Sequence, residues 1–187
     1  MLAAYIIGGI VVVLAVVFIV LYNNLVRLRN QVKNAWAQID VQLKRRHDLI
    51  PNLMETVKGY MKHERETMEA VTKARNLAQQ VASSGAAVRS KAEGELSAAL
   101  GKLIAVAENY PDLKANQNFL ALQEELTSTE NKIGFSRQYY NDSVLRYNNQ
   151  TMMFPSSMIA GVAGFKADDF FEITAPAERE APRVSFT

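Results

Sequence analysis

Four consecutive polar side chains, Arg45, Arg46, His47 and Asp48, stand near the middle of the first half of the 187-residue sequence. Two guanidinium groups beside a carboxylate are suited to binding an acidic partner or a phosphate. A structural alternative is that Asp48 caps a helix beginning there, while the basic residues end the preceding helix and oppose its dipole. Arg45 and Arg46 are therefore candidate partner-surface residues, and Asp48 is a candidate structural residue.

Further charged residues fall on or near apolar helical seams. Glu64 and Arg75 lie on one seam, and Glu130 and Arg137 lie near another. Buried carboxylates with shifted pKa values can serve as acids or bases, whereas paired Glu and Arg side chains can hold neighbouring helices in register. The pattern favours the second role, and the predicted structural polar network comprises Asp48, Glu64, Arg75, Glu130 and Arg137.

The residue types argue against catalysis, metal binding and nucleic-acid binding. The sequence has no cysteine, and its formal net charge is only +2. Helical bundles can build two-metal sites from Glu-x-x-His motifs, but Lys44 and Tyr60 stand three residues before His47 and His63. The sequence also lacks G-x-S-x-G, H-E-x-x-H and P-loop motifs. We therefore expect no enzymatic activity, no catalytic residues, no metal, no cofactor and no nucleic-acid partner.

The residues from Leu2 to Tyr22 carry no charge. About twenty helical residues span roughly 30 Å, the thickness of the hydrocarbon core of a bilayer. A secretory signal peptide is the alternative, but the apolar run starts at residue 2 without a basic leader, which favours a retained anchor. Arg27, Arg29 and Lys33 precede the first acidic residue. This excess of positive charge predicts that the N-terminus lies outside and that the rest is cytoplasmic.

Apolar residues recur at alternating spacings of three and four in four stretches, at residues 25–43, 50–78, 92–106 and 119–147. Such spacing is typical of helices that pack lengthwise. The predicted fold is all-α, with one N-terminal transmembrane helix, an up-down four-helix bundle, a short apolar C-terminal helix and an extended tail. The expected domains are residues 1–24 for the anchor, 25–165 for the bundle and 166–187 for the tail.

The predicted helices are separated by residues that disfavour helix. Pro51 is placed in the first turn of the second helix, because proline is tolerated there. Residues 83–85 and 110–112 end the second and third helices, and Pro155 ends the fourth. Up-down topology then places residues 152–165 on the membrane side. The second helix, however, is about ten residues (~15 Å) longer than the soluble part of the first.

Two groups of residues are candidate interaction surfaces. Tyrosines near the end of the fourth helix suit either an interface or an internal polar network. Residues 152–165 have no charge and are too few to span a bilayer, so they contact lipid, contact another subunit or cover the end of the bundle. The residues in these segments and in the tail are Tyr139, Tyr140, Met152, Met153, Phe154, Met158, Ile159, Phe165 and Phe171.

Several strings in the sequence resemble those of a known family. The most specific is Arg45-Arg46-His47-Asp48-Leu49-Ile50-Pro51-Asn52-Leu53, supported by residues 34–40, 110–115, 122–126 and 154–156. These strings strongly resemble the LemA family of bacterial membrane proteins. The pair Tyr139-Tyr140 departs from the family's pattern. The resemblance implies an N-terminal anchor, a four-helix bundle, a short N-terminus outside and a cytoplasmic bundle, but it does not identify a biochemical activity.

The sequence as a whole favours a membrane-anchored interaction or scaffold protein in the bacterial cell membrane. Membrane lipid is the expected partner of residues 2–22, a homo-oligomer is expected, and other membrane proteins are further candidate partners. Confinement to a membrane raises the local concentration of a bundle, so that weak contacts suffice for assembly. The alternative is a sensor or a ligand-binding module at the membrane.

Overall fold

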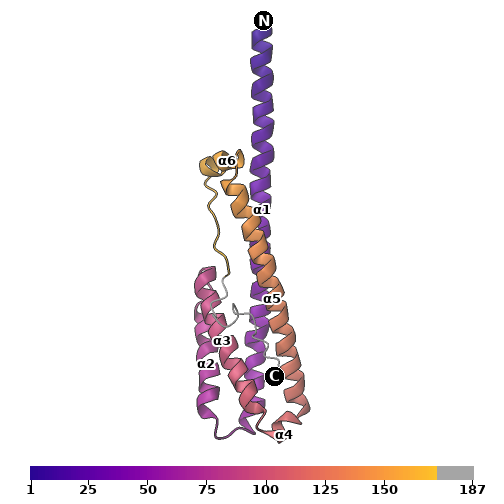
Figure 1. The fold of residues 1–187 in the computed structure, drawn as a ribbon, viewed down its shortest axis with the longest axis vertical. Helices are drawn as coiled ribbons and strands as arrows, with labels where there is room; N and C mark the ends of the chain where they lie inside the picture. The colour runs from indigo at the N-terminus through magenta and orange to yellow at the C-terminus, as the bar shows by residue number, and fades with distance from the viewer. Residues whose placement is uncertain (172–187) are drawn as a thin grey trace, which may run out of the picture. The chain divides into compact units, whose positions relative to one another are not determined.

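The computed structural model describes residues 1–171, and the regular secondary structure of this part is entirely helical (Figure 1). The helices are α1 (Leu2–Lys58), α2 (Arg65–Gln80), α3 (Ala86–Ala107), α4 (Pro111–Lys114), α5 (Gln117–Met152) and α6 (Ser156–Ala163). They form two compact units. The first contains residues 1–39 and 136–168, and the second contains the described residues 40–135 and 169–171.

The first unit begins with an apolar segment that no other described part of the chain covers. Every residue from Met1 to Val20 is exposed, and the helix is long and apolar enough to cross a membrane. A core helix of a soluble protein would bury such residues, whereas a membrane-spanning helix presents them to lipid. The segment therefore indicates a membrane anchor.

The rest of the first unit is built from antiparallel helices. The Trp36 and Tyr140 rings pack with centroids 5.2 Å apart, and α6 packs on Leu25, which lies nearer the start of α1. Residues nearer the start of α1 thus contact residues nearer the end of the chain, so the two segments are antiparallel. Residues 156–165 consequently lie beside the end of the apolar segment, where up-down topology was expected to place them.

The second unit is a four-helix bundle, and it includes the lower part of α1, α2, α3 and the first half of α5. Its core is continuous and apolar. These helices alternate in direction along the chain (Figure 1). The largest buried residues of this core include Ile50, Leu53, Met61, Leu96, Leu103 and Leu113.

One predicted helix boundary is wrong. The chain does not turn at His47–Pro51, since α1 continues to Lys58 with Pro51 inside it. The break falls instead between Lys58 and Arg65, which divides the predicted second helix between α1 and α2. Gly59 directly follows α1, and a glycine after a helix is a common termination signal. Moving the break also reverses the predicted difference in length, because the part of α1 that follows the anchor is now longer than the 16-residue α2.

The other boundaries and the apolar seams agree with the prediction. Val32, Ile39, Val71 and Ile133 are all buried, and α5 ends shortly before Pro155. Of the predicted tail, residues 166–171 are not helical, and residues 172–187 lie outside the described part of the chain.

Candidate functional site

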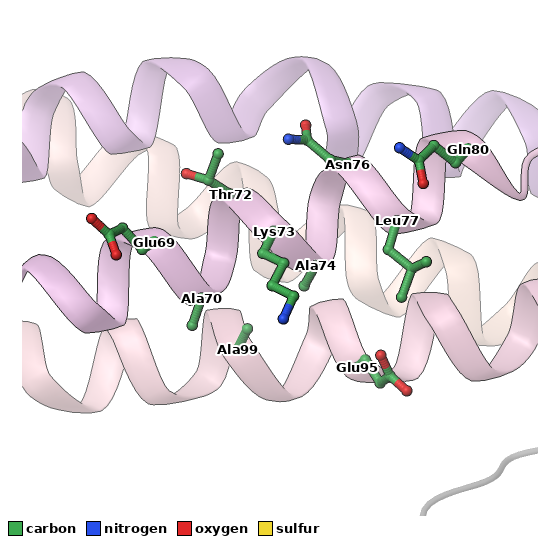
Figure 2. A pocket seen from close by; sticks show the side chains of 10 residues that line it. All are labelled: Glu69, Ala70, Thr72, Lys73, Ala74, Asn76, Leu77, Gln80, Glu95 and Ala99. Atoms are coloured by element: carbon green, nitrogen blue, oxygen red, sulfur yellow. The ribbon is translucent and has the colours of Figure 1, made fainter.

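A groove runs along the second unit between α2 and α3. Figure 2 shows the side chains that line it, among them the small or apolar Ala70, Ala74, Leu77 and Ala99. Lys73 and two glutamates supply its charged groups. Hydroxyl and amide side chains complete the lining, so the groove combines small apolar surfaces with charged and hydrogen-bonding groups.

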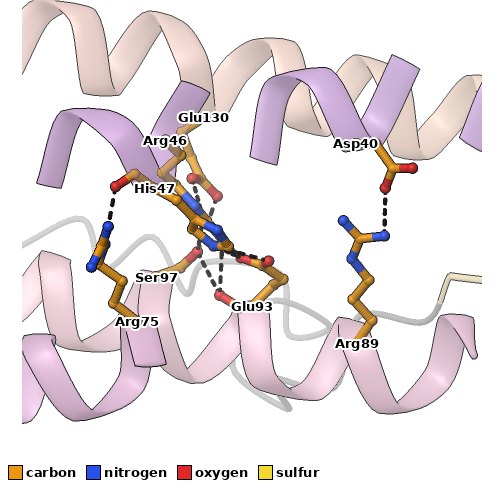
Figure 3. A network of polar contacts seen from close by, with 8 residues as sticks. All are labelled: Asp40, Arg46, His47, Arg75, Arg89, Glu93, Ser97 and Glu130. Carbon is orange, nitrogen blue, oxygen red and sulfur yellow. Dashed lines mark hydrogen bonds and ion pairs between the residues drawn. The ribbon is translucent and has the colours of Figure 1, made fainter. Parts of the chain in front are cut away.

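A network of charged side chains is buried between α1, α3 and α5, and its centre is Arg46 (Figure 3). Nη1 of Arg46 donates to Glu130 Oε2 at 2.6 Å and to Ser97 Oγ at 2.7 Å. Nη2 donates to the Glu93 carboxylate and to the main-chain oxygen of Glu93 at 3.3 Å. Arg46 thus joins side chains from three helices through one planar cation.

His47, the next residue of α1, contacts the same carboxylate. Its Nε2 lies 3.2 Å from Glu93 Oε1 and 3.3 Å from Oε2. Burial alone would raise the pKa of Glu93, but the hydrogen bond from His47 and the positive charge of Arg46 outweigh burial and hold the pKa below its usual value. The Glu93 carboxylate is therefore held in its ionised form between Arg46 and His47.

The main-chain oxygen of His47 is also part of this region. A proline has no N–H, so Pro51 cannot donate to the carbonyl of residue 47, four positions earlier. Arg75 of α2 takes that place, because its Nε donates to the His47 oxygen at 3.0 Å. The contact explains why α1 continues through Pro51: the carbonyl that the proline leaves free is satisfied by another helix.

A second ion pair lies one and a half turns earlier on α1. Arg89, near the start of α3, pairs with Asp40. The order of contacts, Asp40 with Arg89 and Arg46 with Glu93 and Ser97, shows that α1 and α3 run in parallel. The two ion pairs together fix the axial position of α3 along α1.

Burial decides what this network can do chemically. The side chains of Arg46 and Glu93 are 1% and 0% exposed, so a substrate in solvent cannot reach them. The side chain of Glu130 is partly accessible, at 44%. Since removing one member of a buried ion pair leaves an uncompensated charge, the network penalises any other helix register. The arrangement supports a structural role.

Two residues of the predicted polar network lie in this region. Glu130 accepts a hydrogen bond from Arg46, and Arg75 donates one to the main-chain oxygen of His47. Glu64 lies elsewhere and accepts a 3.2 Å hydrogen bond from the Tyr110 hydroxyl. Asp48 is exposed in the interior of α1, so its predicted capping role is wrong. Arg137 is half-buried in the first unit.

The residues of the predicted partner surface differ in burial, and only some of them are exposed. Arg46, Tyr140, Ile159 and Phe171 are buried within the chain, which excludes their side chains from a surface of this monomer. Arg45 is half-exposed and pairs with Glu125 at 2.6 Å. Phe165 is half-buried. The remaining predicted residues are exposed, and they are Tyr139, Met152, Met153, Phe154 and Met158.

Glu93 is the main residue that the sequence reasoning missed. It lies on the buried face of α3, in the series Glu93, Leu96, Leu100, Leu103 and Ala107, at helical spacing. The predicted seam of this helix shares Leu96 and Leu103 with this face but leaves out Glu93; it comprises Ala92, Leu96, Ala99, Leu103 and Val106. A charged residue at the head of a leucine series was the available signal for a buried partner of Arg46.

Within residues 1–171, no three His, Asp or Glu side chains gather in a way that would hold a metal ion. The prediction that the chain takes no cofactor stays a prediction.

The chain was compared with known proteins. The model of the LemA family matches residues 35–186. Protein LemA of Metamycoplasma hominis is 27% identical over 139 residues, which are 74% of this chain and 63% of that protein. Magnetosome protein MamQ 2 of Paramagnetospirillum magneticum is 31% identical over 81 residues, or 43% of this chain and 30% of that protein. MamQ of Magnetospirillum gryphiswaldense is 30% identical over 80 residues, or 43% and 29%.

The chain thus spans less than two thirds of the length of the curated relatives it matches. The family match covers every residue of the buried network, from Asp40 through Glu130. On this match, the chain belongs to the LemA family.

Proposed function

We propose that this chain is a membrane-anchored scaffold without enzymatic activity, which self-associates through its helical bundle. The observation that carries the proposal is the placement of its side chains. The charged groups best suited to chemistry, Arg46 and Glu93, are sealed inside the second unit. The outer face of α5 in the same unit instead presents a bare aromatic ring, because Phe135 is 73% exposed.

The α5 face has the features of a modest contact surface. Leu120 is also exposed, and a shallow depression lined by Thr127, Asn131 and Lys132 connects it to Phe135. Aromatic rings ringed by polar side chains are common at the centre of protein interfaces. A second copy held in the same membrane is the proposed occupant, because a shared anchor raises its effective concentration and lets a small contact suffice.

The proposed location is the bacterial cell membrane, with residues 2–22 as a single span, the N-terminus outside and the bundle cytoplasmic. Three basic residues, Arg27, Arg29 and Lys33, follow the apolar segment before the first acid at Asp40. Basic residues close to a span favour the cytoplasmic side. Labelling of a cysteine at Lys102 by a membrane-impermeant maleimide tests this: protection in intact cells is expected, and labelling there would overturn the orientation.

The natural absence of cysteine provides a direct test of self-association. A single cysteine at Lys132, beside Phe135, is expected to form a disulfide-linked dimer when full-length protein in membranes is oxidised. The matched control, Lys102→Cys on α3, is expected to stay monomeric. Adding Phe135→Ser to Lys132→Cys should abolish the dimer. A monomeric mass in mild detergent together with no crosslink at position 132 would overturn self-association.

The groove between α2 and α3 favours a second candidate function, the binding of a small ligand at the membrane. Its apolar floor of Ala74, Leu77 and Ala99 suits an aliphatic or aromatic group. Full-length protein would be titrated with 1-anilinonaphthalene-8-sulfonate as the probe, and Ala74→Glu should lose the fluorescence gain. A gain that is equal in Ala74→Glu and unaltered protein would exclude the groove.

A further inference from the structure

The short helix α6 is attached to α1 at the end of the apolar segment. Ile159 and Ala160 are buried against Leu25, and Leu21 and Phe165 pack around them. Because Leu25 lies three residues beyond Tyr22, it is only about 5 Å further along the helix axis. The headgroup region extends roughly 5–7 Å on each side of the hydrocarbon core. If residues 2–22 span the bilayer, α6 therefore lies at headgroup depth.

Aromatic and cationic contacts hold the end of this segment in place. The Tyr22 and Phe165 rings pack edge to face with centroids 5.7 Å apart, and the Arg29 guanidinium lies 5.9 Å from the Phe165 centroid. Gly164, with a φ of 72°, lets the chain reverse after α6 and return Phe165 to α1. Tyrosine rings and arginines are favoured at the membrane–water interface.

The opposite face of the segment is apolar and unpaired within the unit. We call it the α6 patch, and its residues are more than 60% exposed: Met152, Met153, Phe154, Met158 and Val162. No charged residue occurs between Arg146 and Lys166. Exposure of these apolar side chains to water is unfavourable in free energy, whereas contact with acyl chains removes that cost.

The backbone of the turn between α5 and α6 is suited to an apolar environment as well. The Ser156 hydroxyl is buried and lies 2.7 Å from the Gln150 main-chain oxygen and 2.8 Å from that of Met153. The Phe165 N–H donates to the Ala160 oxygen at 2.9 Å. Backbone groups that are satisfied internally cost little when they leave water.

Basic side chains border the patch on the aqueous side. Lys166 is exposed one residue beyond Phe165, and Arg29 stands over the Phe165 ring. An apolar face with a basic border is typical of segments that lie in the plane of a bilayer containing anionic lipids.

We propose that the α6 patch inserts into the lipid–water interface of the leaflet from which α1 emerges, and so forms a second membrane contact beside the anchor. Lipid is favoured over a second copy because α6, which carries the patch, packs on Leu25 and Leu21 at the end of the apolar segment and so lies at its depth. The inference rests on the proposed membrane placement of residues 2–22, so the test examines the anchor separately.

The test uses the full chain with single nitroxide-labelled cysteines in phosphatidylcholine–phosphatidylglycerol vesicles. Leu14→Cys reports on the span, Met158→Cys on the α6 patch, and Val88→Cys, an exposed apolar position of α3, is the matched control. Collisions with oxygen, which partitions into lipid, are compared with collisions with a water-soluble nickel chelate. We expect oxygen to dominate at positions 14 and 158 and nickel to dominate at position 88.

Two results would overturn the proposal while the anchor stands. Nickel dominating at position 158 while oxygen dominates at position 14 would place the patch in water. Shielding from both reagents with spin–spin broadening at position 158 would identify a second copy as its occupant. Nickel dominating at position 14 would instead refute the membrane placement itself, and the proposal with it.

Discussion

The Nε of Arg75 donates a 3.0 Å hydrogen bond to the main-chain oxygen of His47, the carbonyl that Pro51 leaves without its usual helical donor. Arg75 therefore supplies the hydrogen bond that Pro51 cannot donate to His47, although Arg75 and His47 are 28 positions apart in the sequence. The contact lets a proline stand inside a 57-residue helix, and it couples α2 to α1 at the level where Arg46 and His47 meet Glu93.

Removing the Arg75 side chain should lower the stability of the folded protein by an amount that depends on whether Pro51 is present. Arg75→Met is expected to lower the free energy of unfolding by about 1–2 kcal/mol, because the His47 carbonyl loses its donor. In a Pro51→Ala background the alanine N–H can take over, so the same change should cost less. Thermal unfolding followed by circular dichroism measures both. Equal costs in the two backgrounds would show that the contact does not compensate for the proline.

Glu93→Gln should be strongly destabilising. The substitution removes the negative charge from the centre of the network and leaves Arg46 with Glu130 alone, so a loss of about 3 kcal/mol is expected. Glu95→Gln is the matched control, because Glu95 is exposed two residues further along the same helix. Chemical denaturation of the full chain gives both values. A cost for Glu93→Gln as small as that of the control would argue against the network as a determinant of stability.

Stability should also fall in acid because of Glu93. Its pKa in the folded protein lies below the usual value of 4.5, so the unfolded state takes up the proton first as the pH falls. The stabilising contribution is therefore complete above about pH 4.5 and is lost as the pH falls through the lowered folded-state pKa. Unfolding curves at a series of acidic pH values should show a steeper decline for the unaltered protein than for Glu93→Gln. Parallel declines would contradict the assignment.

The adjacent arginines of α1 should behave very differently. Arg45 pairs with Glu125 at the surface, with side chains 46% and 49% exposed, and Arg45→Ala is expected to cost less than about 1 kcal/mol. Arg46→Met leaves Glu93 buried without its main cation and should cost about 3–5 kcal/mol. High salt should reduce the Arg45 effect, because exposed charges are screened. Similar costs at the two positions would contradict the burial-based ranking.

Gly164→Ala should loosen the end of α6. A side chain at a φ of 72° costs roughly 1 kcal/mol, so the Phe165 amide, which donates to the Ala160 oxygen, should exchange its hydrogen faster. Gly161→Ala is the control, since it lies within α6 and has open space at its Cβ position. Unchanged exchange in Gly164→Ala would mean that the reversal of the chain does not depend on the glycine.

The seams of the helices were predictable from the sequence because they depend on local periodicity. The residues that return to one face of α5 have spacings of seven, four and three, and this face is buried in the structure: Leu126, Ile133, Tyr140, Val144 and Tyr147. The anchor was also predictable from the sequence, since an uncharged run of that length matches the thickness of a bilayer independently of how the rest of the chain folds.

Only the tertiary structure decided where α1 ends and which charges are paired. Pro51 breaks a helix by local rules, and no local signal shows that Arg75, on another helix, will satisfy the His47 carbonyl. Glu93 likewise became a partner of Arg46 because α3 lies parallel to α1 at one axial position, a relationship between residues 47 positions apart. Periodicity fixes the face that a helix buries, whereas hydrogen bonds between helices are set by how those faces are brought together.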